Sequence, residues 1–500
     1  MERKKTFEKA VKENVKTGSL VVTTKGINSI KKEYTTPPND GDKSYEDSDF
    51  SRSWGLSLLA KPINEDEDYM INFISESGQE LTSMDKGKTP SDAEAKFGKA
   101  LSYITGFKPV RDEANKKMDY GILGYAMSGS DIINLCFNMA HHYRIKDQLK
   151  IRGTLAFFYG AYGGGRGNAG SINWAGWNSG ASKSREQYVL PSPTTLLSPT
   201  EQKNMTKVES ELLDQLEFKA IKKLNELLKI DTANKDRPKA LGALIIEPIQ
   251  GSRGVRFYRP KFLEYLSDWC MKKDVLLIAD EILTGGGRTG KYWSYEHYEG
   301  FRPDLVAFGK GLQIAGVAKT AFAEKKDGAR TMTQYTPGLV TNKAPATLLL
   351  KGARVLNVIT EKTLSEVVER GQLLLKLIRK YQLENLGLEN EATGVGFMIG
   401  AIVPDVEGYN TIREDAPQNY DGYLSFRQRL MPPLDIDPNI LYSYFKTLVE
   451  TELKNDHFPY EHYNNTLKEQ HLKSFDINPK WFTQHESEVS KWYQNKNGKI

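Results

Sequence analysis

The middle of the chain alternates between short apolar runs and longer segments in which apolar residues recur at helical spacing. An apolar run over residues 120–127 is followed by residues 130–145, where apolar positions repeat every three or four residues. Continuous apolar runs are typical of strands buried on both faces, and the helices between such strands connect them in parallel. The pattern predicts an α/β fold whose mainly parallel sheet is flanked by helices.

The same alternation continues toward the C-terminus. Further strands are expected over residues 153–160, 240–247, 275–280, 304–309 and 319–324, with a helix over 210–230. Beyond residue 350 the pattern predicts a second layer, with helices over 347–360 and 365–382 and a strand over 394–403. In a parallel sheet, ligands bind beyond the carboxyl ends of the strands. The residues that follow each apolar run are therefore the candidates for a site.

The residues that follow the apolar runs include glycine and serine at the expected start of a helix, an aromatic residue, carboxylates and a lysine. They are Ser128, Gly129, Ser130, Gly160, Ala161, Tyr162, Glu247, Gln250, Asp280, Glu281 and Lys310. Glycine and hydroxyl groups at a helix N-terminus suit a phosphate, because backbone N–H groups and the helix dipole both face the anion. We expect these groups to converge on one crevice.

One segment, "GGGRTGKY" over residues 285–292, differs by one residue from a nucleotide-binding P-loop. A P-loop needs Ser or Thr after its lysine and a helix that begins there, because the hydroxyl binds magnesium and the helix faces the phosphates. Tyr292 follows Lys291, and the next residues show no apolar stripe. We therefore reject this interpretation and regard the acid at Asp280 as the better indication of chemistry.

Composition narrows the class of protein. The 500 residues allow more than one domain, and 39% hydrophobic with 27% charged residues suits a soluble enzyme. No apolar run approaches the ~18 residues of a membrane span, and the charged N-terminus favours a cytoplasmic location. Two cysteines, Cys136 and Cys270, do not suit a disulfide scaffold, and no metal site is expected. The net charge of +5 is spread along the chain, so no nucleic-acid partner and no membrane partner is expected.

Six segments, in this order along the chain, resemble motifs of the class III pyridoxal-phosphate aminotransferases of fold type I. They are "YAMSGSDI", "FYGAYGGG", "EPIQGSRGV", "ADEILTGGGRTG", "RPDLVAFGKGL" and "RLMPPLDI", and together they span roughly residues 120–436. Pyridoxal phosphate chemistry needs a lysine that forms a Schiff base and a carboxylate that keeps the ring nitrogen protonated. The resemblance implies pyridoxal 5'-phosphate as the cofactor.

The resemblance also implies a role for individual residues. Lys310 is similar to the lysine that forms the internal aldimine and moves the proton, and Asp280 to the acid that pairs with the pyridinium nitrogen. The cofactor-binding set expected on this basis is Gly129, Ser130, Tyr162, Glu247, Gln250, Asp280, Lys310 and Thr341. Thr341 matches a hydroxyl that reaches the phosphate of the neighbouring subunit, which implies a homodimer with shared active sites. Arg429 matches the arginine that holds a substrate carboxylate, a task suited to a planar two-pronged donor.

The resemblance implies a large domain with a seven-stranded sheet and a smaller α+β domain built from both ends of the chain. The expected segments are residues 1–95 (N-terminal arm and part of the small domain), 96–350 (cofactor-binding domain), 351–456 (C-terminal small domain) and 457–500 (C-terminal extension). The function expected is transfer of an amino group between an amino acid or amine donor and a keto acid or aldehyde acceptor. A decarboxylase, racemase or aminomutase with the same fold, and a non-catalytic protein that keeps the fold, are the alternatives.

The chain departs from the family pattern mainly on the substrate side. Gly163 stands where a His is usual, and Ser252 stands where many members have a Glu that pairs with the arginine corresponding to Arg429. Leu283 replaces a residue that is often polar. The glycine-rich insert 163–184 and the extension have no counterpart. These departures indicate that the cofactor chemistry is kept while the substrate is unusual.

Overall fold

The structure is a computed structural model. It describes residues 92–112, 117–145, 153–164, 169, 187–228, 240–251, 254–323, 344, 346–386, 392–402 and 427–434. The predictions for the N-terminal arm up to residue 91, for Ser252 and Thr341, for most of the 163–184 insert and for the 457–500 extension lie outside these residues. The four predicted segments of the domain division remain predictions.

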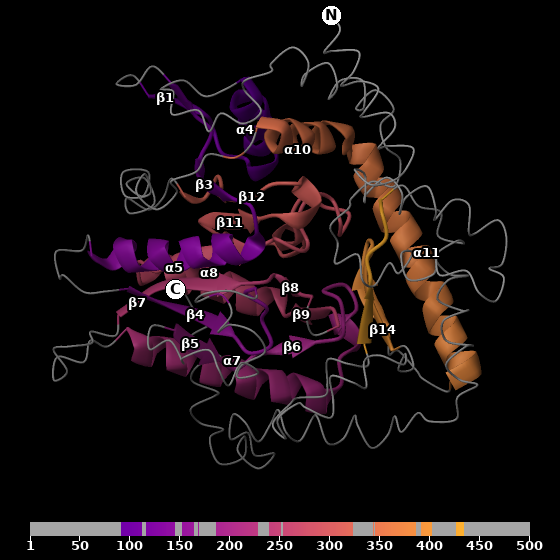
Figure 1. Cartoon of the computed structure of the whole chain (residues 1–500). Coiled ribbons are helices and arrows are strands. Elements are labelled where there is room, and N and C mark those ends of the chain that lie inside the picture. Colours follow the sequence, from indigo (N-terminus) through magenta and orange to yellow (C-terminus); the bar gives the residue numbers. More distant parts are fainter. Residues whose placement is uncertain are drawn as a thin grey trace, which may run out of the picture.

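A seven-stranded sheet forms the centre of the described structure (Figure 1). From edge to edge its strands are β3 (Ile122–Ala126), β12 (Ala315–Lys319), β11 (Leu305–Phe308), β10 (Leu276–Asp280), β7 (Ala240–Ile246), β4 (Gly153–Phe158) and β5 (Gln187–Leu190). β12 runs antiparallel to both of its neighbours, and the pairs from β11 to β5 are parallel. Six of the seven strands therefore point the same way, which confirms the predicted mainly parallel sheet.

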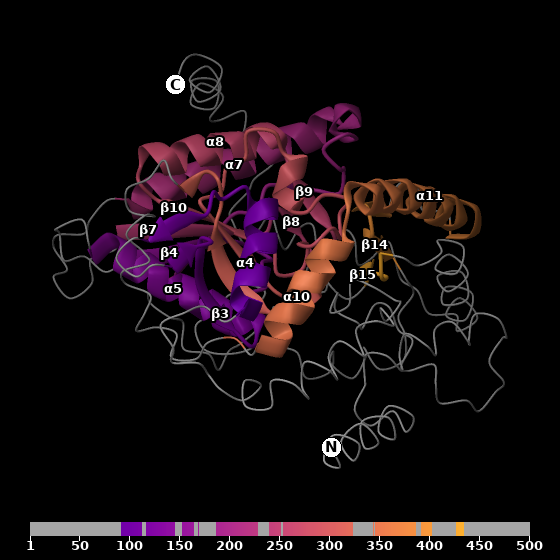
Figure 2. The ribbon, with the colours of Figure 1, turned by 90° about the horizontal axis from the view of Figure 1, so that it is seen from above.

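Helices cover both faces of this sheet. They are α4 (Asp92–Thr105), α5 (Gly129–Ile145), α7 (Lys207–Leu227), α8 (Pro260–Lys272) and α10 (Ala346–Val358). The remaining described helix, α11 (Glu361–Leu386), packs instead against the strands within residues 393–402. In Figure 2, α7 and α8 lie on one side of the sheet and α5 on the other. Successive residues of a strand point to opposite faces, so Leu276 and Ile278 of β10 join the core under α5, whereas Leu277 and Ala279 join the core under α7 and α8. Burial on both faces explains why the strands appear in the sequence as continuous apolar runs.

The strand predicted over residues 319–324 is wrong, because β12 ends at Lys319. Thr320 leaves the sheet in a turn, where its N–H donates to Asp304 O at 3.0 Å. The true strand contains Gly316, at which an added Cβ would lie 2.4 Å from the Phe308 ring and 2.9 Å from Gly124 O. Close packing against both neighbouring strands thus requires glycine at position 316, although glycine is unfavourable inside a strand. For this reason the apolar pattern did not predict a strand here.

The strand predicted over residues 394–403 is also wrong, because it is a hairpin of β13 (Thr393–Val395) and β14 (Met398–Ile402). Gly396, with φ +54°, makes the turn, and an added Cβ there would lie 2.5 Å from the backbone carbon of Thr289. β15 (Arg427–Leu430) completes this antiparallel sheet, which we call the small sheet. It lies beside α11 in Figure 1.

Short elements complete the described chain. β1 (Val110–Asp112) pairs with β2 (Lys117–Asp119), and β6 (Thr194–Thr195), β9 (Arg256–Tyr258) and β8 (Ile249–Gln250) form a third small antiparallel sheet. Three 3₁₀ turns, η3 (Gln202–Asn204), η4 (Ser294–His297) and η5 (Lys310–Leu312), connect larger elements. The last of these directly follows β11 and carries the predicted lysine.

Candidate active site

The predicted acids and the predicted lysine lie at the same edge of the large sheet. Asp280 is the last residue of β10, and it is in register with Ala307 of β11, three residues before Lys310. On the other side of β10, Ala279 is in register with Ile246, the residue that precedes Glu247. Neighbouring strands are about 4.8 Å apart. The sheet thus brings Lys310, Asp280 and Glu247 together at the ends of three adjacent parallel strands.

Lys310 has a backbone conformation that is rare for a residue with a side chain. Its φ is +39°, in the left-handed region that favours glycine, and it begins η5, where Gln313 N–H donates to Lys310 O at 2.8 Å. Non-glycine residues keep such conformations where the surrounding structure enforces them, and these positions cluster at functional sites. The pKa of the Lys310 amine is lowered to about 8, first by burial and then by the charge of Arg429, whereas Asp280 and Glu247 act in the opposite direction.

Asp280 is 9% exposed. The pKa of Asp280 is raised to about 8, first by burial and then by the neighbouring carboxylate of Glu247. The N–H of Ile282, which donates to Asp280 Oδ1 at 3.1 Å, lowers this pKa, and so does the charge of Lys310. A carboxyl group with this pKa is protonated at neutral pH, and a cationic group placed beside it favours its ionised form. Asp280 can therefore both supply a proton to a basic ring nitrogen and pair with the resulting cation.

Glu247 joins two backbone segments. Its Oε1 accepts the N–H of Tyr162 at 3.0 Å, and its Oε2 accepts the N–H of Gly251 at 3.0 Å. Burial raises the pKa of Glu247, while these two hydrogen bonds and the charges of Arg429 and Lys310 lower it. The carboxylate thus fixes the segment after β4 to the segment after β8, at the centre of a group of four charged side chains.

Gln250 is buried beside the same segment. Its amide Nε2 donates to Tyr159 O at 2.9 Å, and Ser192 Oγ donates to its Oε1 at 3.4 Å. These contacts attach the turn that follows β4 to the rest of the sheet edge. The structure therefore gives Gln250 backbone and side-chain partners within the protein; its predicted cofactor contact remains a prediction.

The first turn of α5 carries Gly129 and Ser130, for which phosphate binding was predicted. Ser128 caps the helix, because its Oγ accepts the N–H of Asp131 at 3.3 Å. Ser130 is the second residue of α5. An added Cβ on Gly164 would lie 2.2 Å from Ser130 Oγ. Gly164 also has φ +120°. The chain after Tyr162 thus passes directly over the start of α5, and Tyr162 itself is 37% exposed.

Ile282 connects this helix start to the lysine. An added Cβ on Gly129 would lie 3.1 Å from the Ile282 side chain, and one on Gly309 would lie 3.3 Å from it. Three segments, after β3, β10 and β11, therefore meet at one side chain. The sequence pattern did not single out Ile282, because an apolar residue after a strand carries no periodic signal. Ser128, one of the residues predicted to follow the first apolar run, proves to be the cap of α5.

The small sheet brings Arg429 to the site. Arg429 is in register with Gly400 of β14, so the two residues share one face of the sheet. An added Cβ on Gly400 would lie 2.1 Å from Gly254 O, and one on Gly251 would lie 2.7 Å from Met398 Cε. The face that carries Arg429 therefore packs against Gly251 and Gly254, in the connection between β8 and β9. Arg429 acts on the pKa values of both Lys310 and Glu247 from this position.

The glycine-rich segment after Asp280 is a structural connection. Glu281 is fully buried, and it accepts hydrogen bonds from Thr284 Oγ1, from Ser294 Oγ at 2.9 Å and from Tyr295 N–H at 2.9 Å. Burial raises its pKa to about 7, and these hydrogen bonds lower it. No α-helix begins between Gly290 and Ser294; the described chain there leads into η4. This geometry confirms that the segment is not a P-loop.

Arg288 links the same segment to the small sheet. It is fully buried, its Nη1 donates to Pro432 O, and its own carbonyl accepts the N–H of Phe397 at 2.9 Å. Burial lowers the pKa of Arg288 to about 10. The residue range just after β15, and the turn between β13 and β14, are therefore both tied to the loop that follows Asp280.

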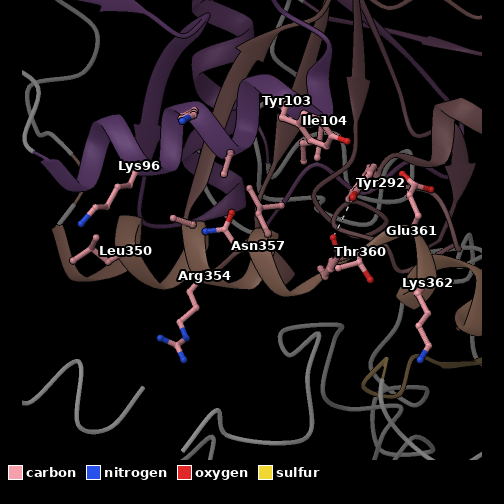
Figure 3. Close-up of a pocket in the computed structure, with 15 residues that line it drawn as sticks. Lys96, Tyr103, Ile104, Tyr292, Leu350, Arg354, Asn357, Thr360, Glu361 and Lys362 are labelled. Carbon is pink, nitrogen blue, oxygen red and sulfur yellow. Dashed lines mark hydrogen bonds between the residues drawn. The ribbon is translucent and has the colours of Figure 1, made fainter. Parts of the chain in front are cut away.

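A separate groove of about 960 Å³ lies between α4 and α10 (Figure 3). Tyr103 and Tyr292 line it with ring centroids 6.4 Å apart, and Lys96 and Arg354 lie at its rim. None of the predicted site residues lines this groove. Its size alone is a weaker indication of chemistry than the charged groups at the sheet edge.

The arrangement at the sheet edge fits pyridoxal phosphate. The start of α5 offers backbone N–H groups and the Ser130 hydroxyl to a phosphate, and Asp280 offers an acid to a ring nitrogen. Lys310 offers an amine whose pKa of about 8 leaves a sizeable neutral fraction near neutral pH. Within the part of the chain that the structure describes, no group of three or more His, Cys, Asp and Glu residues is placed to hold a metal ion. Of the described helices, none is both long and apolar enough to cross a membrane.

Comparison with known proteins agrees with this site. The family described as Aminotransferase class-III matches residues 104–418. An acetylornithine aminotransferase from Aquifex aeolicus (strain VF5) is 35% identical over 178 residues, which cover 36% of this chain and 44% of that protein. An L-lysine-epsilon aminotransferase from Amycolatopsis lactamdurans is 32% identical over 175 residues, which cover 33% of this chain and 37% of that protein. The chain thus spans less than half the length of these relatives.

Solved structures share the fold over a longer stretch. A lysine aminotransferase from M. tuberculosis in the internal aldimine form superposes with a TM-score of 0.58 at 20% identity, covering 80% of this chain and 88% of that one. An amine transaminase from an uncultivated Pseudomonas species in the PLP-bound form gives a TM-score of 0.61 at 16% identity, covering 80% and 90%. This likeness confirms the expected fold type I architecture. Since the family match covers most of the chain and the sheet has the expected architecture, the chain belongs to the class III aminotransferase family.

Proposed function

We propose that this chain is a pyridoxal-phosphate-dependent aminotransferase, which moves an amino group from an amino acid or amine donor to a keto acid or aldehyde acceptor. The observation that carries the proposal is the placement of Lys310 and Asp280 at the ends of neighbouring parallel strands, beside the start of α5. Family membership supports the same conclusion. The substrate-side departures leave the identity of the donor to experiment.

Each residue of the site has a task in this reaction. Bound pyridoxal phosphate would supply an aldehyde that bonds to amines and a ring that accepts electrons. Lys310 Nζ takes a proton from the substrate carbon and returns it, a role suited to an amine whose pKa lies near the working pH. Asp280 holds a proton at the ring nitrogen. Gly129 and Ser130 bind the phosphate, and Tyr162 stacks on the ring.

Arg429 would bind a carboxylate of the donor or the acceptor. A guanidinium binds carboxylates with two parallel hydrogen bonds, which fixes the orientation of the substrate as well as its charge. The position of Arg429, on the small-sheet face that packs against Gly251 and Gly254, supports this role. Binding at this residue would orient the amino end of a substrate toward Lys310.

The proposal includes a homodimer with shared sites, in which Thr341 reaches the phosphate of the neighbouring subunit. A small-molecule amino donor and a carbonyl acceptor are the other partners. We also propose a cytoplasmic location. Cys136 and Cys270 are both buried and form no disulfide, which suits a reducing compartment.

The absorbance spectrum of the purified protein tests the cofactor and the lysine together. Lys310→Arg keeps the positive charge, but a guanidinium does not condense with an aldehyde, so the band of the lysine-bound cofactor should disappear and activity should fall by at least about 10³-fold. Lys319→Arg is the matched control, because Lys319 is another buried lysine, paired with Asp119 at 3.4 Å. It should keep both the band and the activity.

A screen of amino donors then tests the reaction. Addition of a productive donor without an acceptor should convert the cofactor to its amine form, and addition of a keto acid should reverse the change. A wild-type protein that binds the cofactor but releases carbon dioxide, or isomerises a donor without any acceptor, would contradict the aminotransferase proposal.

A further inference from the structure

Arg288 binds two strands of the small sheet at the same end. Its own carbonyl accepts the N–H of Phe397 at 2.9 Å, and its Nη1 donates to Pro432 O. Phe397 directly precedes β14, and Pro432 lies two residues after β15, the antiparallel partner of β14. The start of one strand and the end of the other therefore meet at a single residue of the loop that follows Asp280. Arg429 lies in β15, three positions before Pro432.

The loop that carries Arg288 also packs closely against the small sheet and α11. An added Cβ on Gly396, in the turn between β13 and β14, would lie 2.5 Å from the backbone carbon of Thr289. An added Cβ on Gly290 would lie 2.3 Å from the side chain of Val368 in α11. Contacts as close as these leave little room for the loop to move relative to the small sheet.

The other end of this loop is fixed at the site itself. Asp280 is the last residue of β10, and the next residue, Glu281, is fully buried. The carbonyl of Glu281 accepts the N–H of Gly285 at 2.9 Å, and its carboxylate accepts Ser294 Oγ and the N–H of Tyr295, each at 2.9 Å. The position of Arg288 is thus set from the end of β10, where the acid of the site lies.

We propose that Arg288 is a positioning residue, which fixes β15, and with it Arg429, relative to Asp280. A substrate carboxylate bound by Arg429 then lies at the correct distance from the reacting end of the site. This inference rests on the proposed function. Arg288 is fully buried, so it acts through Arg429 and not by contact with the substrate. A guanidinium suits this task, because its rigid, planar set of donors fixes direction as well as distance.

The test compares two donors of equal chain length on the holoenzyme, 4-aminobutyrate with a carboxylate and butylamine without one. Arg288→Met keeps an unbranched side chain but removes the donor to Pro432 O. KM for 4-aminobutyrate should rise by about tenfold or more, with kcat changed less than about threefold. KM for butylamine should change less than about twofold, and the cofactor band should remain. An equal rise for both donors, or no rise for 4-aminobutyrate, would overturn the inference.

Arg259→Met is the matched control for a loss of stability. Arg259 is also mostly buried, and its Nε lies 2.6 Å from Glu217 Oε1, while its Nη2 pairs with Asp214. Both partners belong to α7. This variant should unfold at lower urea concentration than the wild type and leave both KM values unchanged. A rise in KM for 4-aminobutyrate alone in this control would show that lost stability suffices, and would contradict the role of Arg288.

Arg288→Lys tests rescue by a conservative change. It keeps the positive charge and one donor that can approach Pro432 O, but it loses the planar fork. KM for 4-aminobutyrate should therefore rise only about threefold, and KM for butylamine should stay unchanged. If Arg288→Met does not fold, this smaller rise carries the test. The same rise for butylamine, or none for 4-aminobutyrate, would then overturn the inference.

A double-mutant cycle shows whether Arg288 acts through Arg429. Arg429→Ala alone should raise KM for 4-aminobutyrate, and adding Arg288→Met to it should raise KM no further. Additive effects of the two substitutions would show that Arg288 acts on another part of the site.

The outcomes separate this inference from the proposed function. A wild-type protein that binds no cofactor, or that transfers an amino group from no donor, contradicts the proposed function. If the wild type uses other donors, a productive amino acid and the amine that lacks its carboxylate replace the first pair. A wild-type protein that is active on such a pair, with Arg288 variants that affect both donors equally, contradicts the role of Arg288 alone.

Discussion

At the scale of single residues, burial moves the pKa values of Asp280 and Lys310 in opposite directions to about the same value. The acid rises to about 8 and the amine falls to about 8. At neutral pH the two groups therefore hold protons with similar strength, although their ordinary pKa values differ by more than six units. Such a pair can exchange roles as proton donor and acceptor when a ring nitrogen or an aldehyde arrives.

The raised pKa of Asp280 has a measurable consequence for the cofactor-free protein. The folded protein keeps a proton on Asp280 up to about pH 8, whereas the unfolded chain loses it near pH 4. Between these values the folded state binds more protons, so its stability falls as the pH rises. Asp280→Asn removes this penalty, and its stabilisation over the wild type should be larger at pH 8.5 than at pH 5.5, by at least about 1 kcal/mol.

Urea unfolding of the cofactor-free protein at the two pH values measures this difference. Glu281, with a pKa of about 7, contributes a similar slope to both proteins, so it cancels in the comparison. A stabilisation that does not change between pH 5.5 and 8.5 would show that the Asp280 carboxyl is not protonated in the folded protein.

At the scale of elements, the small sheet depends on Gly400 for its contact with the connection between β8 and β9. Gly400→Ala places a methyl group against Gly254 O, a backbone atom that cannot rotate away. We expect the free energy of unfolding to fall by about 1–3 kcal/mol, as for other overpacked positions. KM for 4-aminobutyrate should also rise, because β15 shifts together with β14. Chemical denaturation and donor kinetics measure the two effects; an unchanged KM would show that Arg429 does not depend on this contact.

The sequence predicted most elements because these are strands buried on both faces, with helices that have one apolar stripe. It failed where close packing overrides the apolar pattern. β12 contains Gly316, which lies against Phe308, and the hairpin turn at Gly396 lies against the backbone of Thr289. Neither contact leaves a trace in local periodicity, since each partner is distant in the chain.

Prediction of the site was limited in the same way. The residue types at the ends of the strands showed which groups converge, because strand order places them at one edge. They did not show that both oxygens of Glu247 are occupied by backbone N–H groups, one of them from Tyr162, 85 positions earlier. A partner of this kind depends on tertiary geometry and not on residue type. The roles of the individual site residues stay predictions until the variants are measured.

At the scale of the whole molecule, the proposed shared sites predict complementation between two inactive variants. Lys310→Ala lacks the lysine of its own site, and Thr341→Ala lacks the hydroxyl that it would give to the partner's site. In a mixed dimer, one site combines an intact Lys310 with an intact Thr341. Random exchange of subunits should therefore restore about a quarter of the sites, as expected for an interface that is shared symmetrically.

Activity after mixing the two purified proteins under conditions that exchange subunits measures this recovery. Mixing Lys310→Ala with Asp280→Asn is the control, because both residues belong to the same subunit's site. Their mixed dimer has no intact site, so the mixture should show no more than the residual activity of its two components. Recovery in the control, or none in the test pair, would contradict the sharing of Thr341.

The strand order has a further consequence for how the chain is made. Within the described part of the large sheet, β3 lies at one edge beside β12, and Ala126 is in register with Ala315, almost 190 positions later. During synthesis the ribosome therefore releases β3 and α5 well before the strand that pairs with β3. Over this interval the edge of β3 lacks its partner, and an unpaired strand edge favours aggregation. The last strand of the large sheet to be made is also the one that closes it.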